Sequence, residues 1–131
     1  MALAAVVRDE FSAPFFDAGA EGRLLLRYSP SSGDWSEPAA LVCSATQAED
    51  LEWREASGRG RLVTWTTKPG RSRDGEVIPD TTIGIVETDE GPWLTLLLPD
   101  ADPRSLRVGA PTVVEFVQPE GSEHLPVARL V

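Results

Sequence analysis

Short runs of β-branched, aromatic and aliphatic residues, separated by turn residues, fill the second half of the chain. The runs are Arg61–Thr67, Thr81–Thr88, Pro92–Leu98, Thr112–Val117 and Leu125–Val131. Turn signals such as Asp89-Glu90-Gly91 lie between them, which is typical of β-strands. The first run is preceded by Leu51–Glu55 and by Ser57-Gly58-Arg59-Gly60, where glycines allow a strand to bulge and bend. We therefore predict a long, bent first strand followed by four more.

Two connections complete this pattern. Pro99–Gly109 predicts one helical turn, with Asp102 as its cap and Pro103 at its first position. Pro69–Pro79 predicts a polar, mobile loop. Five strands, a bent first one and a helical turn between the third and fourth describe an OB-fold barrel.

The N-terminal part predicts one helix over Asp9–Ala20, in which Ser12 can act as the cap and Pro14 fits the first turn. Phe11, Phe15 and Phe16 give this helix an apolar face. The face can dock on the chain's own core or anchor a partner protein, and the sequence leaves both open. We take this face as the preferred partner anchor, and the barrel surface near Trp65 as the second.

Between the helix and the barrel, Arg23–Tyr28 predicts a short strand, and Trp35–Cys43 predicts a second segment that runs back beside it. A tight turn follows each of them. This hairpin-like unit is too small to hold a core of its own. We therefore predict two parts: residues 1–50 with the helix and this unit, and residues 51–131 with the barrel. The fold class is mostly β.

Composition agrees with a small domain of short elements, since 131 residues contain eleven prolines and eleven glycines. A single cysteine, Cys43, excludes an intrachain disulfide and suits a reducing compartment. The apolar N-terminus is too short for a signal peptide or a membrane span, so we expect a cytoplasmic protein without a membrane partner.

Charge is unevenly distributed along the chain. The net charge of −9 argues against nucleic acid, because cationic side chains supply most of the affinity for phosphates. Six of the twelve basic residues nevertheless lie in residues 54–73, against the single acid Glu55: Arg54, Arg59, Arg61, Lys68, Arg71 and Arg73. This basic strip suits a small anionic ligand or a protein contact, and equally a set of solvated strand-edge charges.

Catalysis finds little support in the residues. The single histidine, His124, leaves no Ser-His-Asp set, and Asp89-Glu90 is better explained as a turn than as an acid–base pair. Gly58-Arg59-Gly60 does not open a helix, so it is not a phosphate-binding loop. We therefore assign no catalytic residue and no cofactor of its own to the chain.

The order of these features resembles a known family. They are Phe15-Phe16, Gly22-Arg23-Leu24-Leu25, Gly33, Pro38, Cys43, Leu51-Glu52-Trp53, Ser57-Gly58-Arg59-Gly60, Asp89-Glu90-Gly91 and Val108-Gly109. The set is similar to the acyl-CoA-associated OB-fold family (domain of unknown function thirty-five) that carries a rubredoxin-like zinc ribbon before its barrel. No single piece is diagnostic, but the ordered set spans nearly the whole chain.

The chain departs from this family at the zinc ligands. The four ligand positions hold Ser29, Ser32, Cys43 and Thr46, so that three thiolates have become hydroxyls. Structural zinc needs four Cys or His ligands, and neutral hydroxyls are poor donors for it. We therefore predict a metal-free ribbon held by packing, in which Cys43 is an inert buried thiol.

The resemblance implies a non-catalytic accessory subunit of a thiolase-like enzyme: an acyl-CoA thiolase, an aldolase or a ketosynthase-like acyltransferase. Such a subunit stabilises its partner and helps to form its acyl or CoA site. Arg59, Arg61 and Lys68 would then contact a CoA phosphate within the complex. Two alternatives stay open: an OB module that binds single-stranded nucleic acid through Trp65 and Trp93, and a stand-alone enzyme of unknown type.

Overall fold

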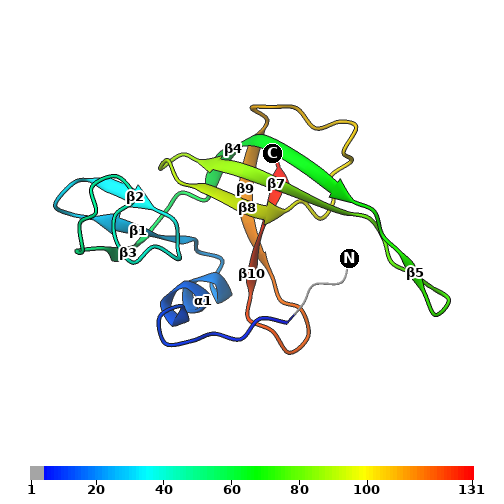
Figure 1. Cartoon of the computed structure of the whole chain (residues 1–131), viewed down its shortest axis with the longest axis horizontal. Helices are drawn as coiled ribbons and strands as arrows, with labels where there is room; N and C mark the ends of the chain where they lie inside the picture. The colour runs from blue at the N-terminus through cyan, green and yellow to red at the C-terminus, as the bar shows by residue number, and fades with distance from the viewer. Residues whose placement is uncertain (1–4) are drawn as a thin grey trace.

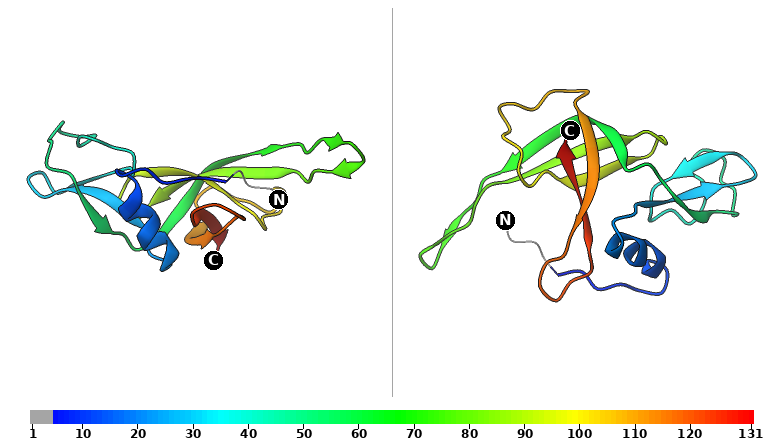
Figure 2. Two further views of the ribbon diagram at one scale, coloured as in Figure 1. Left: turned by 90° about the horizontal axis from the view of Figure 1, so that it is seen from below. Right: turned by 180° about the vertical axis from the view of Figure 1, so that it is seen from behind.

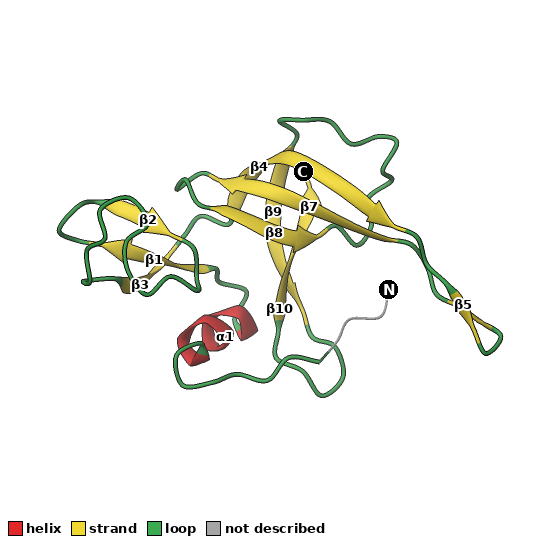
Figure 3. Ribbon diagram, in the orientation of Figure 1, coloured by secondary structure: helices red, strands yellow, loops and turns green. Residues whose placement is uncertain are grey.

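The computed structural model describes residues 5–131 and is mostly β (Figures 1 and 3). Its elements are α1 (Ala13–Ala20), β1 (Leu25–Ser29), β2 (Asp34–Ser36), β3 (Glu52–Glu55), β4 (Arg59–Lys68), β5 (Ser72–Arg73), β6 (Glu76–Val77), β7 (Thr81–Thr88), β8 (Trp93–Leu97), β9 (Pro111–Val117) and β10 (Leu125–Leu130). Five of these strands close a barrel, and β2, β1 and β3 form a separate three-stranded sheet.

The barrel confirms the predicted OB-type fold. Its strands follow the order β10-β8-β7-β4-β9, and β9 pairs with β10 to complete the ring. All neighbours are antiparallel except β8 and β10, which run parallel. Leu62, Val86 and Leu98 are fully buried inside the barrel, because alternate residues of each strand point to its interior.

Strand β4 bends where the sequence places its glycines, but the first strand is shorter than predicted. Gly58 adopts φ 78°, and Glu52–Glu55 before it pairs with β1 rather than with the barrel. Gly60 lies so close to β7 that an added Cβ would meet the Glu87 carbonyl oxygen at 2.4 Å. The register then shifts between Leu62 and Thr64, which curves the strand. The two pieces are therefore separate strands in different sheets.

The helix and the three-stranded sheet pack beside the barrel (Figure 1). Helix α1 begins at Ala13, four residues later than predicted, because Asp9 and Ser12 hydrogen bond to each other's backbone N–H in a turn before it. One hydrophobic cluster joins α1, β1 and the barrel through Phe15, Phe16, Leu26 and Leu62. The division at residue 50 stays a prediction, and β3 lies beyond it although it belongs to the sheet of β1.

Two connections differ from the prediction. The predicted loop 69–79 is a hairpin of β5 and β6 that projects from the barrel as a narrow arm (Figure 2). The predicted helical turn at 99–109 is a series of turns: Asp102 caps Arg104 N–H at 3.0 Å, but no helix follows. The prolines and glycines of this loop are compatible with a helical turn and with a series of β-turns, so the sequence did not distinguish the two conformations.

Candidate functional site

Two knuckle-shaped turns in the three-stranded sheet hold the four positions of the zinc-ligand pattern. In the first, Gly33 N–H donates to the Ser29 carbonyl at 2.8 Å; in the second, Gln47 N–H donates to the Cys43 carbonyl at 2.9 Å. Gly33 and Gln47 both adopt positive φ, at 76° and 64°. The two turns therefore have similar backbone conformations, although the residues at their ligand positions differ.

A carboxylate now organises the first knuckle. The Ser29 hydroxyl donates to Asp50 at 2.6 Å, and the Ser31 backbone N–H donates to the second carboxylate oxygen of Asp50 at 2.9 Å. These bonds stabilise the charged form, so they lower the pKa of Asp50 below its ordinary value. Sequence reasoning missed Asp50, whose only signal was an acid four residues beyond the second knuckle.

Cys43 is fully buried at the centre of the second knuckle, with its sulfur 3.8 Å from the Ser32 hydroxyl. Hydrogen bonds from the Thr46 side chain and the backbone N–H groups of Thr46 and Ala45 lower the pKa of Cys43 to about 7. These bonds resemble those that support a metal thiolate, but one sulfur and three hydroxyls do not make a zinc site. Residues 5–131 also contain no group of three His, Cys, Asp or Glu side chains placed to hold a metal.

The predicted partner anchors separate in the structure. Phe15 and Phe16 lie in the chain's own core, with Phe15 6.4 Å from the Phe116 ring. The preference for them as partner contacts is therefore corrected, because their surface is already covered. Phe11 remains 37% exposed and packs on Trp53 at 5.7 Å. Trp65 is half-buried against the barrel core, and its role as a contact stays a prediction.

An arginine that the sequence did not single out sits between two of these aromatic rings. The Arg27 guanidinium lies 5.3 Å from the Phe11 ring and 4.7 Å from the Trp53 ring. Its Nη2 donates to the Leu51 carbonyl at 3.1 Å, and burial lowers its pKa. The stack ties the segment before α1 to β1 and β3, so its role is first of all structural.

The structure splits the predicted phosphate contacts into two places. Arg59 and Arg61 extend from the same face of β4 and line a groove of about 630 Å³ with Thr112 and Val131. Lys68 lines another groove, of about 370 Å³, at the base of the arm. Seven residues of strand separate Arg61 from Lys68, about 20 Å. One phosphate group cannot therefore bridge all three side chains.

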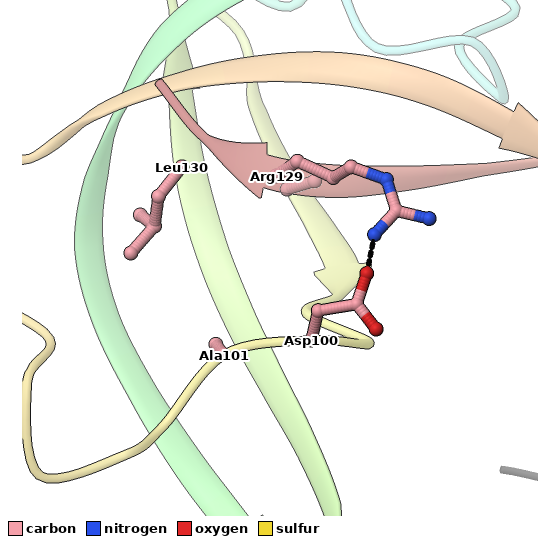
Figure 4. Close-up of a pocket in the computed structure, with 5 residues that line it drawn as sticks. Asp100, Ala101, Arg129 and Leu130 are labelled. Atoms are coloured by element: carbon pink, nitrogen blue, oxygen red, sulfur yellow. Dashed lines mark hydrogen bonds and ion pairs between the residues drawn. The ribbon is translucent and has the colours of Figure 1, made fainter.

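A further pocket, of about 280 Å³, lies where β10 passes the end of β8 (Figure 4). Arg129 and Asp100 form an ion pair at its mouth, and Arg129 also pairs with Glu115. Because both of its partners are carboxylates, Arg129 is neutralised within the chain. Arg59 and Arg61 make no ion pair among the described residues, which is also true of Lys68 and Arg107, and Asp89 lines the same groove as the two arginines.

A family model and a curated relative each match part of the chain. The family model described as "ChsH2, C-terminal OB-fold domain" matches residues 53–117. A DUF35 domain-containing scaffold protein from Pyrococcus furiosus is 25% identical over 72 residues. That match covers 55% of this chain and 53% of the relative, so the chain spans about half the length of this curated relative.

Solved structures resemble the whole chain. A chain from a structure described as "Ltp2-ChsH2(DUF35) aldolase" has a TM-score of 0.76 and 23% identity, with 98% of both chains covered. A DUF35-family protein of unknown function from Sulfolobus solfataricus has a TM-score of 0.64 and 11% identity, with 93% of this chain and 86% of that chain covered. These likenesses confirm the arrangement of helix, small sheet and barrel. In residues 5–131, no helix is long and apolar enough to cross a membrane.

Proposed function

We propose that this chain, which is similar to OB-fold proteins of the DUF35 family, is a non-catalytic accessory subunit of a thiolase-like enzyme. The observation that carries this proposal is its end-to-end fold match to a chain from an assembly named for two proteins and an aldolase activity. A relative named as a scaffold protein supports the same role. The enzyme would be an acyl-CoA thiolase, an aldolase or a ketosynthase-like acyltransferase.

The groove of Arg59 and Arg61 supports a share in the partner's ligand site. Both side chains are exposed, and the groove between them and Pro111 is open to solvent on one side. Exposed single charges hold an anion weakly, because water screens them. We propose that the partner enzyme covers this groove, and that Arg59 and Arg61 then contact a CoA phosphate in a less hydrated setting. Lys68 lies too far along β4 to join them.

The association itself is tested by co-expression. The chain is produced with each thiolase-like enzyme of the source organism in turn, and the pairs are analysed by size-exclusion chromatography with light scattering. One enzyme should elute with the chain at a fixed stoichiometry and lose activity or solubility without it. If every such enzyme elutes separately and is fully active alone, the proposal fails.

A further inference from the structure

The hairpin formed by β5 and β6, residues 69–80, stands away from the rest of the molecule. Figures 1 and 2 show it as a narrow arm that continues the line of β4 and β7 beyond the barrel. Every described side chain of this arm is exposed to solvent, and none belongs to the hydrophobic core. A hairpin with two residues in each strand gains little stability of its own. The arm therefore projects from the molecule without contributing side chains to its hydrophobic core.

The arm nevertheless has a defined conformation. Asp74 and Gly75 form its tip with φ values of 51° and 80°, a combination typical of tight hairpin turns. At its base, Gly70 N–H donates to the Asp80 carboxylate at 2.8 Å. A Cβ on Gly70 would meet the Ile78 carbonyl oxygen at 1.7 Å, so only glycine allows the two strands to approach this closely. These features specify one hairpin conformation, in contrast to an irregular loop that accepts many sequences.

The arm carries apolar side chains where a solvated hairpin would carry polar ones. Val77, the last residue of β6, is 84% exposed, and the next residue, Ile78, is 43% exposed. The outer face of β7 continues this surface, since Thr82, Gly84 and Val86 point inward while Ile83 and Ile85 alternate with them and stay partly exposed. Adjacent exposed aliphatic residues on a projecting element are typical of a docking surface.

Charge along the arm favours a different protein over a second copy of this chain. Lys68 and Arg71 lie on the outgoing side of the hairpin, at the end of β4 and just before β5, whereas Glu76 and Asp80 lie on the returning side, in β6 and just before β7. Two copies that paired their arms about a twofold axis would place like charges against each other at either edge. The arm thus discourages edge-to-edge self-pairing, while its outgoing side carries basic residues and its returning side carries acidic and apolar residues.

We propose that the arm docks into a cleft of the partner enzyme, an inference that rests on the accessory-subunit function proposed above. Val77 and Ile78 contact the apolar floor of this cleft. Carboxylates on one wall face Lys68 and Arg71, and cations on the other wall face Glu76 and Asp80. A long, projecting contact of this kind reaches past the barrel surface and fixes the orientation of the subunit on the enzyme.

The test uses the full chain and the enzyme that co-elutes with it. The double variant Val77→Asp/Ile78→Asp should weaken binding at least about tenfold in a titration calorimetry or biolayer measurement, because it places charge on an apolar floor. The matched control is Val108→Asp, which changes a 75%-exposed valine in the loop between β8 and β9. The control should change the affinity less than about twofold. Circular dichroism melts should be the same for all three proteins.

A second measurement does not depend on affinity. Cys43 is fully buried, so a cysteine introduced on the surface is the one readily modified thiol of the described chain. A photo-crosslinker attached to Val77→Cys should join the chain to the enzyme, and the same reagent on Val108→Cys should not. If the wild-type chain binds the enzyme but the arm variants bind equally and do not crosslink, the arm inference fails alone. If the wild-type chain binds no thiolase-like enzyme, the proposed function fails and the arm inference with it.

Discussion

At the residue scale, hydrogen bonds hold the two knuckles at the positions where the family resemblance places zinc ligands. Gly33 and Gln47 still provide the positive φ of the two knuckles, and backbone N–H groups still point at the Cys43 sulfur. The Asp50 carboxylate accepts bonds from Ser29 and Ser31, where a metal would otherwise draw the first knuckle together. A buried hydroxyl without a partner would be costly, and Asp50 is the closer of the two side chains that bond the Ser29 hydroxyl, the other being Ser31.

We predict that Asp50→Asn lowers the melting temperature at pH 7, because an amide accepts these bonds less strongly than a carboxylate. The lowered pKa of Asp50 means that its contribution is fully present above the ordinary carboxyl pKa and is lost as the pH falls through the lower folded value. The melting temperatures of wild type and variant should therefore converge below about pH 4. Glu49→Gln is the control, and an equal loss at pH 7 from this control would contradict the role of Asp50.

The thiol of Cys43 gives a second prediction at this scale. Because hydrogen bonds lower its pKa to about 7, the folded chain favours the thiolate. This stabilisation is present above the ordinary thiol pKa and is lost as the pH falls toward 7. Relative to Cys43→Ala, wild type should therefore gain melting temperature between about pH 7 and pH 9. A constant difference across this range, measured by thermal melts, would show that the sulfur acts only through packing.

At the element scale, the preserved knuckles predict that the zinc site can be restored. The triple variant Ser29→Cys/Ser32→Cys/Thr46→Cys supplies four thiolates on two turns of matching geometry, so it should bind one zinc per chain. Elemental analysis of chelator-free protein should find this zinc in the variant and none in wild type. One zinc per wild-type chain, or unfolding of wild type by EDTA, would overturn the assignment of a metal-free ribbon.

The helix offers a matched pair of aromatic substitutions. Phe15→Ala removes a ring from the cluster shared with the barrel and should cost about 3 kcal/mol of unfolding free energy. Phe11→Ala removes a partly exposed ring that stacks on Arg27 and should cost less than half as much, about 1 kcal/mol. Urea unfolding measures both. Equal costs for the two variants would mean that the segment before α1 is buried as firmly as the helix itself.

The elements that the sequence predicted are those with strong local signals. Alternation in Thr81–Thr88 and Thr112–Val117 matches barrel strands almost residue for residue, because one face of each is buried. Glu52–Glu55 was misassigned because its pairing partner is β1, whose Leu26 lies 28 residues before its partner Arg54, and a contact so distant in sequence leaves no local signal. The arm was missed because its charged residues have no periodic pattern. Asp50 and Arg27 act through contacts that only the folded chain brings together.

At the scale of the whole molecule, the charges divide by location. The arginines of the ribbon half are engaged: Arg23 pairs with Glu21 and Glu55, and Arg54 pairs with Glu52 and stacks on Tyr28. On the barrel, Arg59 and Arg61 extend into an open groove without an ion pair among the described residues. In a chain of net charge −9, two unpaired arginines beside one groove give an external anion a local positive site, although Asp89 also lines this groove.

The last prediction concerns the ligand of this groove and separates the three residues proposed from the sequence. The isolated chain should give almost no heat with an acyl-CoA in calorimetry, because its groove is open and its charges are screened. The complex should bind the acyl-CoA, and Arg59→Glu or Arg61→Glu should weaken that binding about tenfold or more. Lys68→Glu is the matched charge reversal, about 20 Å along β4. Measured at protein concentrations that keep the complex assembled, it should leave the affinity of the complex for acyl-CoA unchanged. Tight binding by the isolated chain, or an equal loss from all three reversals, would place the phosphate site elsewhere and leave Arg59 and Arg61 as solvated edge charges.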